Sequence, residues 1–280
     1  MNSLLSLFDS EQTDAPTSRR GALGTVGKLG LGAALATVPF LKPQAARAQS
    51  NSTNLLDIDG DGDMDPFDVL NYALTLEYLE RSFYRQALGM NYLSGTALDV
   101  ANMLARDEAA HVLVLRGAIQ DAGEDPVQYT DDDFDFGDFL ASRASFLTLA
   151  QHLEDTGVRA YKGQATNIQA AAPAYLQTAL QIHSVEARHA AAIRRLRGNQ
   201  GWIPNSQPGA AVPAVYGAGN GFPAEGNTTQ GGVNLATAFA NNGYTTEQIT
   251  EAFDEGLDMT TVLGIAGGFI TGNEGDGEED

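Results

Sequence analysis

The sequence predicts an all-α protein built on a four-helix bundle, with one long crossover between the second and third helices. Two observations favour this fold class. Long segments between residues 65 and 198 carry apolar residues at helical spacing, separated by helix-ending glycines. The same region contains a coarse internal repeat that carries glutamate and histidine at matching positions. A loop-rich C-terminal extension with short helices follows the bundle.

Each helix of the bundle has its own start and stop signals. In the first, Asp65 is placed to act as N-cap, Pro66 to occupy the first helical position, and Gly89 to end the helix. Thr96 begins the second, and Asp99 follows it at the spacing of a capping box. The expected helices span residues 65–88, 96–122, 137–163 and 173–197.

The connections predict how the helices are arranged. The links between the first two helices and between the last two are short, so each pair forms an antiparallel hairpin. The segment from Gly123 to Phe136 is mostly Asp, Pro and aromatic. Extended, it spans about 45 Å, which is longer than a helix of two dozen residues. This segment can therefore cross the whole length of the bundle.

The internal repeat relates the two hairpins. When the second hairpin is aligned with the first, Glu154 falls on Glu77 and Tyr161 on Tyr84. An offset that differs by a single position places the pair Glu186/His189 on Glu108/His111. Two hairpins related in this way would bring all four helices to one shared site. The repeat therefore predicts that these side chains converge.

Six side chains form a candidate ligand set for two metal ions. Glu-x-x-His places a carboxylate and an imidazole one turn apart on the same helical face. One such pair alone is usually a solvated face, but two copies, each with an upstream glutamate at matching distance, favour a dimetal site. One imidazole and shared carboxylates per ion suit iron or manganese. The candidate ligands are Glu77, Glu108, His111, Glu154, Glu186 and His189.

This ligand pattern resembles that of the ferritin-like di-iron carboxylate proteins, over about residues 65–197. Asp107 and Arg188 are similar to parts of an Asp-Glu-x-Arg-His form found there, in which the aspartate holds a ligand histidine. Each repeat keeps only one of these two residues. More narrowly, residues 74–80, 153–161 and 251–255 resemble a secreted ferritin-like group called desiccation-related proteins. The resemblance implies a ferritin-like fold, two Fe or Mn ions and an association with stress.

Several residues near the ligands have two interpretations. Tyr84 and Tyr161, two turns from ligand glutamates, either hydrogen-bond or relay an electron near the site, or are ordinary core residues. Glu80 is an alternative ligand, or a supporting or solvated residue. His183, one turn before Glu186, is a candidate for contacting metal or substrate. His152 is expected to point away and to be exposed.

An Asp-rich segment precedes the first helix. Positions 1, 3, 5, 6, 9 and 12 of a calcium loop are occupied by Asp57, Asp59, Asp61, Gly62, Asp65 and Asp68, although aspartate replaces the usual glutamate at position 12. The alternative is an acidic linker whose last aspartates cap the first helix. The candidate calcium ligands are Asp57, Asp59, Asp61, Asp63, Asp65 and Asp68.

The segment through Ala48 is typical of an export signal. Arg19 and Arg20 precede a glycine-rich apolar run, and Ala46-Arg47-Ala48 is a small-x-small cleavage pattern. The paired arginines resemble a twin-arginine signal, which predicts export to the periplasm, cell envelope or exterior. An uncleaved anchor is the alternative, but the glycines make a poor membrane span, so none is expected after cleavage. The expected domains are the export signal (residues 1–48), the acidic linker or calcium loop (49–64), the four-helix bundle (65–198), and the C-terminal extension with its acidic tail (199–280).

Composition excludes several function classes. The chain has no cysteine, which excludes disulfides and thiolate chemistry. The formal net charge of the whole chain is −20, and the segment through Ala48 carries +2. The remainder is therefore at −22, which disfavours binding to nucleic acid.

The expected function is an exported dimetal protein that reacts with dioxygen or peroxide, through ferrous oxidation or peroxide removal. A manganese catalase is less favoured. The alternative is a non-enzymatic stress or envelope protein with a structural metal or none. An oligomer is compatible with the sequence, but a 24-subunit cage is not favoured because of the C-terminal extension.

Overall fold

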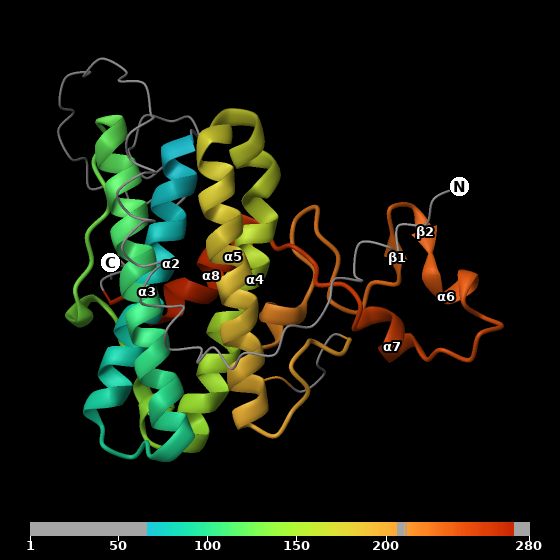
Figure 1. Ribbon diagram of the computed structural model, residues 1–280, viewed down its shortest axis with the longest axis horizontal. Coiled ribbons are helices and arrows are strands. Elements are labelled where there is room, and N and C mark those ends of the chain that lie inside the picture. Colours follow the sequence, from blue (N-terminus) through green and yellow to red (C-terminus); the bar gives the residue numbers. More distant parts are fainter. Residues whose placement is uncertain (1–65, 206–209, 211, 272–280) are drawn as a thin grey trace, which may run out of the picture. The chain divides into compact units, whose positions relative to one another are not determined.

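Four long helices form the centre of the protein. The computed structural model describes residues 66–205, 210 and 212–271. The helices are α2 (Pro66–Gly89), α3 (Gly95–Ala122), α4 (Arg143–Ala171) and α5 (Pro173–Leu196), and Figure 1 shows them packed side by side. The closest helix pairs are α2 with α3 and α4 with α5. The predicted bundle of two antiparallel hairpins is confirmed.

Glycine ends two of these helices as expected. Gly123 follows α3 in the left-handed conformation, with φ of 89°, and its N–H bonds the last turn of the helix. Gly198 lies just beyond α5 with φ of 79°. The third helix differs from its prediction. The 3-10 helix η3 (Gly137–Leu140) occupies the expected start, and α4 begins only after Ser142, whose hydroxyl accepts the Ser145 N–H.

The crossover from α3 to α4 follows α2 along its length. The N–H of Val127 donates to Asn71 in the first turns of α2, and the ring of Tyr129 contacts that of Tyr78 in the middle. Gln86, near the end of α2, donates to the carbonyl of Phe134. The crossover includes the 3-10 helix η2 (Asp131–Asp133). These contacts match the predicted passage along the bundle.

Aromatic residues anchor the end of the crossover in the core. Phe136 is buried, and its ring centroid lies 5.1 Å from that of Phe83 in α2. Phe83 in turn stacks on Phe146 of α4, with centroids 5.2 Å apart. Such pairs combine burial of a large apolar area with favourable ring geometry. The crossover is therefore part of the core.

The C-terminal extension has little regular structure. It contains the 3-10 helices η4 (Pro213–Tyr216) and η5 (Gly267–Phe269) and a two-stranded antiparallel ladder of β1 (Thr229–Gln230) and β2 (Val233–Asn234). Its short α-helices are α6 (Leu235–Ala238), α7 (Thr246–Thr250) and α8 (Met259–Ala266).

Helix α8 packs against α4 and α2, and its Val262 and Leu263 are buried in the main core. Phe239 and Phe253, by contrast, are exposed. Their segments belong to the irregular part of the extension.

A buried arginine holds the extension against α4. Arg159 is fully buried and pairs with Glu225, with Nε 2.9 Å from Oε1. Its guanidinium also donates to backbone carbonyls of the extension: Val215, Gly217, Pro223, Glu255 and Gly256. Because Arg carries five donors in a fixed fork, one side chain can join several loop segments. The extension is therefore tied to the bundle through a buried polar centre.

Two sequence expectations lie outside the described residues. The export signal does so entirely, and so does the Asp-rich loop apart from Asp68, which is buried in the first turn of α2. Among the described helices, none is both long and apolar enough to cross a membrane.

Candidate metal centre

The six predicted ligands meet inside the bundle. Their donor atoms form two overlapping groups, and within each group they lie no more than 4.8 Å from one another. All six residues are buried, and the four glutamates are 0% exposed. The first group is Glu77, Glu108, His111 and Glu186; the second is Glu108, Glu154, Glu186 and His189.

Helical geometry accounts for this convergence. Each ligand lies well inside its helix, with about two turns or more on either side, so its backbone is fixed by helical hydrogen bonds. In α3 and α5 the glutamate and the histidine are one turn apart and share the inner face. The two hairpins face each other, so each supplies half of the donor atoms.

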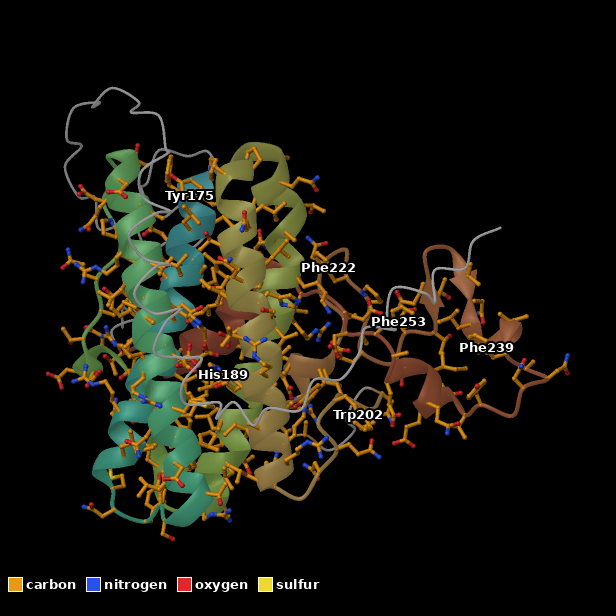
Figure 2. The ribbon with its side chains drawn as sticks, in the orientation of Figure 1. Tyr175, His189, Trp202, Phe222, Phe239 and Phe253 are labelled. Atoms are coloured by element: carbon orange, nitrogen blue, oxygen red, sulfur yellow. The ribbon has the colours of Figure 1, made fainter. Side chains whose placement is uncertain are left out.

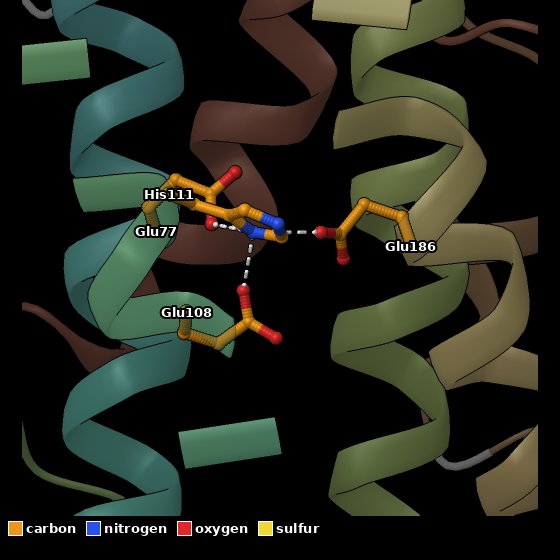
Figure 3. Close-up of side chains that lie close together, drawn as sticks. All are labelled: Glu77, Glu108, His111 and Glu186. Carbon is orange, nitrogen blue, oxygen red and sulfur yellow. Dashed lines mark hydrogen bonds and ion pairs between the residues drawn. The ribbon is translucent and has the colours of Figure 1, made fainter. Parts of the chain in front are cut away.

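The first group surrounds the Nδ1 atom of His111. This atom lies 2.8 Å from Glu108 Oε2, 3.0 Å from Glu77 Oε2 and 3.2 Å from Glu186 Oε1 (Figure 3). The three carboxylates come from three different helices. Such an arrangement places a ring nitrogen and several oxygens around one point.

The second group surrounds Nδ1 of His189 in the same way. This nitrogen lies 2.9 Å from Glu108 Oε1, 3.3 Å from Glu154 Oε2 and 4.0 Å from Glu186 Oε2. The centroids of the two imidazole rings are 6.2 Å apart. Glu108 and Glu186 each direct one oxygen to each histidine, so they are common to both groups. The remaining four residues belong to one group each.

The two tyrosines connect the hairpins reciprocally. Tyr84 of the first hairpin donates to Glu154 Oε1 of the second, and Tyr161 of the second donates to Glu77 Oε1 of the first. Both tyrosines are buried, and burial raises the pKa of each hydroxyl, reinforced by the neighbouring glutamate. The tyrosines therefore remain protonated and orient one oxygen of each carboxylate. This matches the hydrogen-bonding interpretation of these residues.

Asp107 reaches the site from α3. Its Oδ2 lies 3.3 Å from Nε2 of His189 in α5, so it holds the histidine of the other hairpin. The hydrogen bond from His189 lowers the pKa of Asp107, although partial burial opposes the shift. An acceptor at Nε2 orients the ring and leaves Nδ1 facing the glutamates.

Two other candidates are not brought to the centre. Arg188 lies on the exposed side of α5, where it cannot contact a ligand bound inside the bundle. His183 is half-buried and belongs to neither donor group. Burial and the nearby Lys162 lower its pKa.

Glu80 and His152 are both buried, which decides between the interpretations that the sequence allowed. Glu80 is buried beside the cluster, so the solvated alternative is wrong. Its counterpart in the repeat is Gly157, where a Cβ would lie 3.2 Å from Glu186 Oε2 and 3.4 Å from Glu80 Oε1. A fifth carboxylate thus occupies space that a glycine leaves. The expectation that His152 is exposed is also wrong: it is buried, with its ring against Tyr216.

The electrostatics of the cluster favour a cation. Burial raises the pKa of Glu108 to about 7, against the lowering effect of both histidines, and raises the pKa of Glu80 and Glu186 well above the usual value. For His111 and His189, burial lowers the pKa, but the surrounding glutamates raise it more strongly. Without an added cation, the cluster is neutralised by protons.

Several atoms of the candidate ligands are buried and have no hydrogen-bond partner. Counting every partner in the described part of the chain, five atoms have none: Glu108 Oε1, Glu154 Oε2, both carboxylate oxygens of Glu186, and His189 Nδ1. His189 Nδ1 is close to Glu108 Oε1, but not in hydrogen-bond geometry. Buried polar atoms are normally satisfied, and leaving them unpaired is costly. Two cations between the four helices would satisfy them, so the donor set fits a pair of metal ions.

Comparison with known proteins agrees with this geometry. The family model for a ferritin-like domain matches residues 65–199, which include the four long helices and all six candidate ligands. A search among curated proteins found no significant match.

Proposed function

Because residues 65–199 match the family model for a ferritin-like domain, we propose that the protein binds two iron or manganese ions and uses them to reduce dioxygen or peroxide. One observation carries the proposal. Four carboxylate oxygens and one imidazole nitrogen of the cluster are buried inside the bundle without a hydrogen-bond partner. Four carboxylates balance the charge of two divalent ions while the histidines stay neutral. Two such ions, when bound, supply electrons to a small oxidant.

The chain's own residues would divide the task. His111 and Glu77 would hold one ion, and His189 and Glu154 the other, with Glu108 and Glu186 between them. Because Glu108 and Glu186 each direct one oxygen to each histidine, these two side chains would be shared by both ions.

The surrounding groups would keep the ligands in place. Tyr84 holds one oxygen of Glu154, and Tyr161 holds one oxygen of Glu77. The other oxygen of each glutamate stays available to bind an ion. Asp107 holds the ring of His189. The apolar core around the cluster excludes bulk water, which strengthens the binding of charged ligands.

Ferrous oxidation or peroxide removal under stress is the reaction class we favour, consistent with the resemblance to desiccation-related proteins. Export by the twin-arginine route is part of the same proposal, and it rests on residues 18–48. That route carries folded proteins, so the ions could be inserted before export.

An anaerobic titration with Fe²⁺ tests the proposal. Calorimetry should give two ions per chain, and exposure to oxygen should then oxidise the iron much faster than iron free in the same buffer. A protein in which Glu108 and Glu186 are both changed to Gln is the control, because it lacks both shared carboxylates. Binding of two ions without any oxidation by oxygen or peroxide would instead indicate a structural metal site and a non-enzymatic protein.

A further inference from the structure

A small cavity lies inside the bundle beside the metal centre. Its volume is about 30 Å³, and all four long helices contribute to its wall. The lining includes Val69 and Leu76 of α2, Leu115 of α3 and Ile168 of α4. These residues place the cavity between the ligand cluster and the end of the bundle where α4 turns into α5. In Figure 2, Tyr175, which also lines the cavity, lies nearer that end than His189.

The cavity is suited to an apolar occupant. Its wall is almost entirely aliphatic or aromatic. The hydroxyl of Tyr161 is already bonded to Glu77, and the side-chain oxygen of Gln164 accepts from Asn167. Only the hydroxyl of Tyr72 is buried without a hydrogen bond among the wall residues that the structure describes. A buried water needs two to four polar partners, so water is poorly held here.

The size of the cavity limits the occupant further. Sites for drug-sized organic molecules usually have about 300–1,000 Å³. A cavity one-tenth of that size or less admits a single small molecule. Hydrogen peroxide would fit by volume, but its donors and acceptors would lose their hydrogen bonds to water. Dioxygen is apolar, so it loses no hydrogen bonds to water when it enters the cavity.

One side chain of the cavity wall contacts a candidate ligand directly. Tyr161 lines the cavity, and its hydroxyl donates to Glu77. Leu76 precedes Glu77 in the chain, and Leu115 lies one turn after His111. At the other end, the lining residues Tyr175 and Thr178 are only half-buried. The cavity therefore lies between a partly exposed stretch of α5 and the metal centre.

We propose that this cavity is a binding site for dioxygen, which holds the gas beside Tyr161 before it reaches the metal centre. The proposal rests on the proposed function and makes it more specific, because it selects dioxygen over peroxide as the oxidant that the bundle admits by this path. Peroxide would have to reach the centre by another path.

Xenon tests the site independently of activity. Xenon is an apolar atom that occupies small dry cavities. In methyl NMR spectra of the wild-type protein under xenon, the signals of Val69, Leu76 and Leu115 should shift. Leu104 and Leu147, in the half of the bundle beyond the ligands, should not. Absence of shifts at the three cavity residues would overturn the proposal.

A cavity-filling variant tests the role of the site. Ala118→Val adds two methyl groups at the wall on α3, whereas Ala110→Val makes the same change on an exposed part of α3. In iron-loaded protein, Ala118→Val should slow oxidation by dioxygen roughly tenfold, equivalent to about 1.4 kcal/mol of lost affinity. Oxidation by peroxide and the number of bound ions should be unchanged, and Ala110→Val should behave as wild type.

The outcomes separate this proposal from the proposed function. If Ala118→Val loses the xenon shifts but reacts with dioxygen at the wild-type rate, the cavity is no part of the dioxygen path. Equal slowing with both oxidants also counts against it. If wild-type protein binds xenon but fails to bind or oxidise iron, the proposed function fails while the cavity remains a site for apolar gas.

Discussion

Replacing His111 with alanine should remove one metal ion from the centre and leave the other. His111 belongs to only one of the two donor groups, together with Glu77, and His189 belongs only to the other. Glu186 is common to both. The structure therefore predicts two ions for the wild type, one each for His111→Ala and His189→Ala, and weakened binding at both positions for Glu186→Gln.

The size of the effect follows from the number of sites. Each ion present at about 100 times the dissociation constant of its own binding step stabilises the folded state by about 2.7 kcal/mol. With two such sites the wild type should gain about 5 kcal/mol, and each single histidine variant about half of that. Glu186→Gln, which alters both sites, should gain the least.

Calorimetric titration with Mn²⁺ gives the number of ions, and urea unfolding with and without Mn²⁺ gives the gain in free energy. Mn²⁺ avoids oxidation by air during the measurement. His183→Ala is the matched control, because His183 lies on α5 but outside both donor groups. The reasoning is refuted if His111→Ala loses both ions, or if Glu186→Gln keeps two at wild-type affinity.

Three other predictions follow from the contacts around the centre and the extension. Asp107→Ala should weaken the ion held by His189 by roughly 10–100-fold and leave the other ion unaffected, as calorimetry would show; equal weakening of both would contradict it. At about pH 8, where Glu225 is ionised, Arg159→Met should lower the free energy of unfolding in urea by about 3–5 kcal/mol, because it leaves the Glu225 carboxylate buried without its cation; a loss below about 1 kcal/mol would show that the pair is not needed. Burial raises the pKa of Glu225 from 4.5 to about 7 despite Arg159, so the folded state holds a proton there that the unfolded state releases. The stability of wild type relative to Glu225→Gln should therefore fall, by up to roughly 3 kcal/mol, as pH rises from about 4.5 to about 7 in urea titrations; a rise would mean that pairing with Arg159 outweighs burial.

Much of the fold could be predicted because helices leave local signals. The ends of α3 and α5 follow from Gly123 and Gly198, which adopt the left-handed conformation that favours glycine. The start of α4 could not be predicted in the same way. Residues 137–140 do form helical turns, but of the 3-10 type, and the capping of Ser142 by Ser145 sets the start of α4.

The candidate metal centre was predictable to the extent that its pattern repeats. Equal spacing in both hairpins identified the six ligands that the structure brings together. Features that occur once gave a weaker signal: the role of Asp107 was only implied by the family resemblance, and Glu80 kept three alternative roles. Asp107 contacts the histidine of the other hairpin, and Glu80 enters the cluster because its counterpart is Gly157.

The polar anchor of the extension was not predictable from local sequence. Arg159 lies in the middle of a helix, and its partners lie far along the chain in segments with almost no regular structure. The same applies to His152, whose burial depends on Tyr216. Tertiary contacts of this kind override the helical periodicity that would leave these side chains in solvent.

The reciprocal tyrosines make the two hairpins dependent on each other. Neither hairpin contains the acceptor for its own tyrosine, and neither contains a complete donor group. A chain cut within the crossover would consequently yield two fragments whose complementary parts meet only after they associate. The bundle therefore consists of two similar halves. Two copies of a single ancestral hairpin, paired with each other, would have the same arrangement.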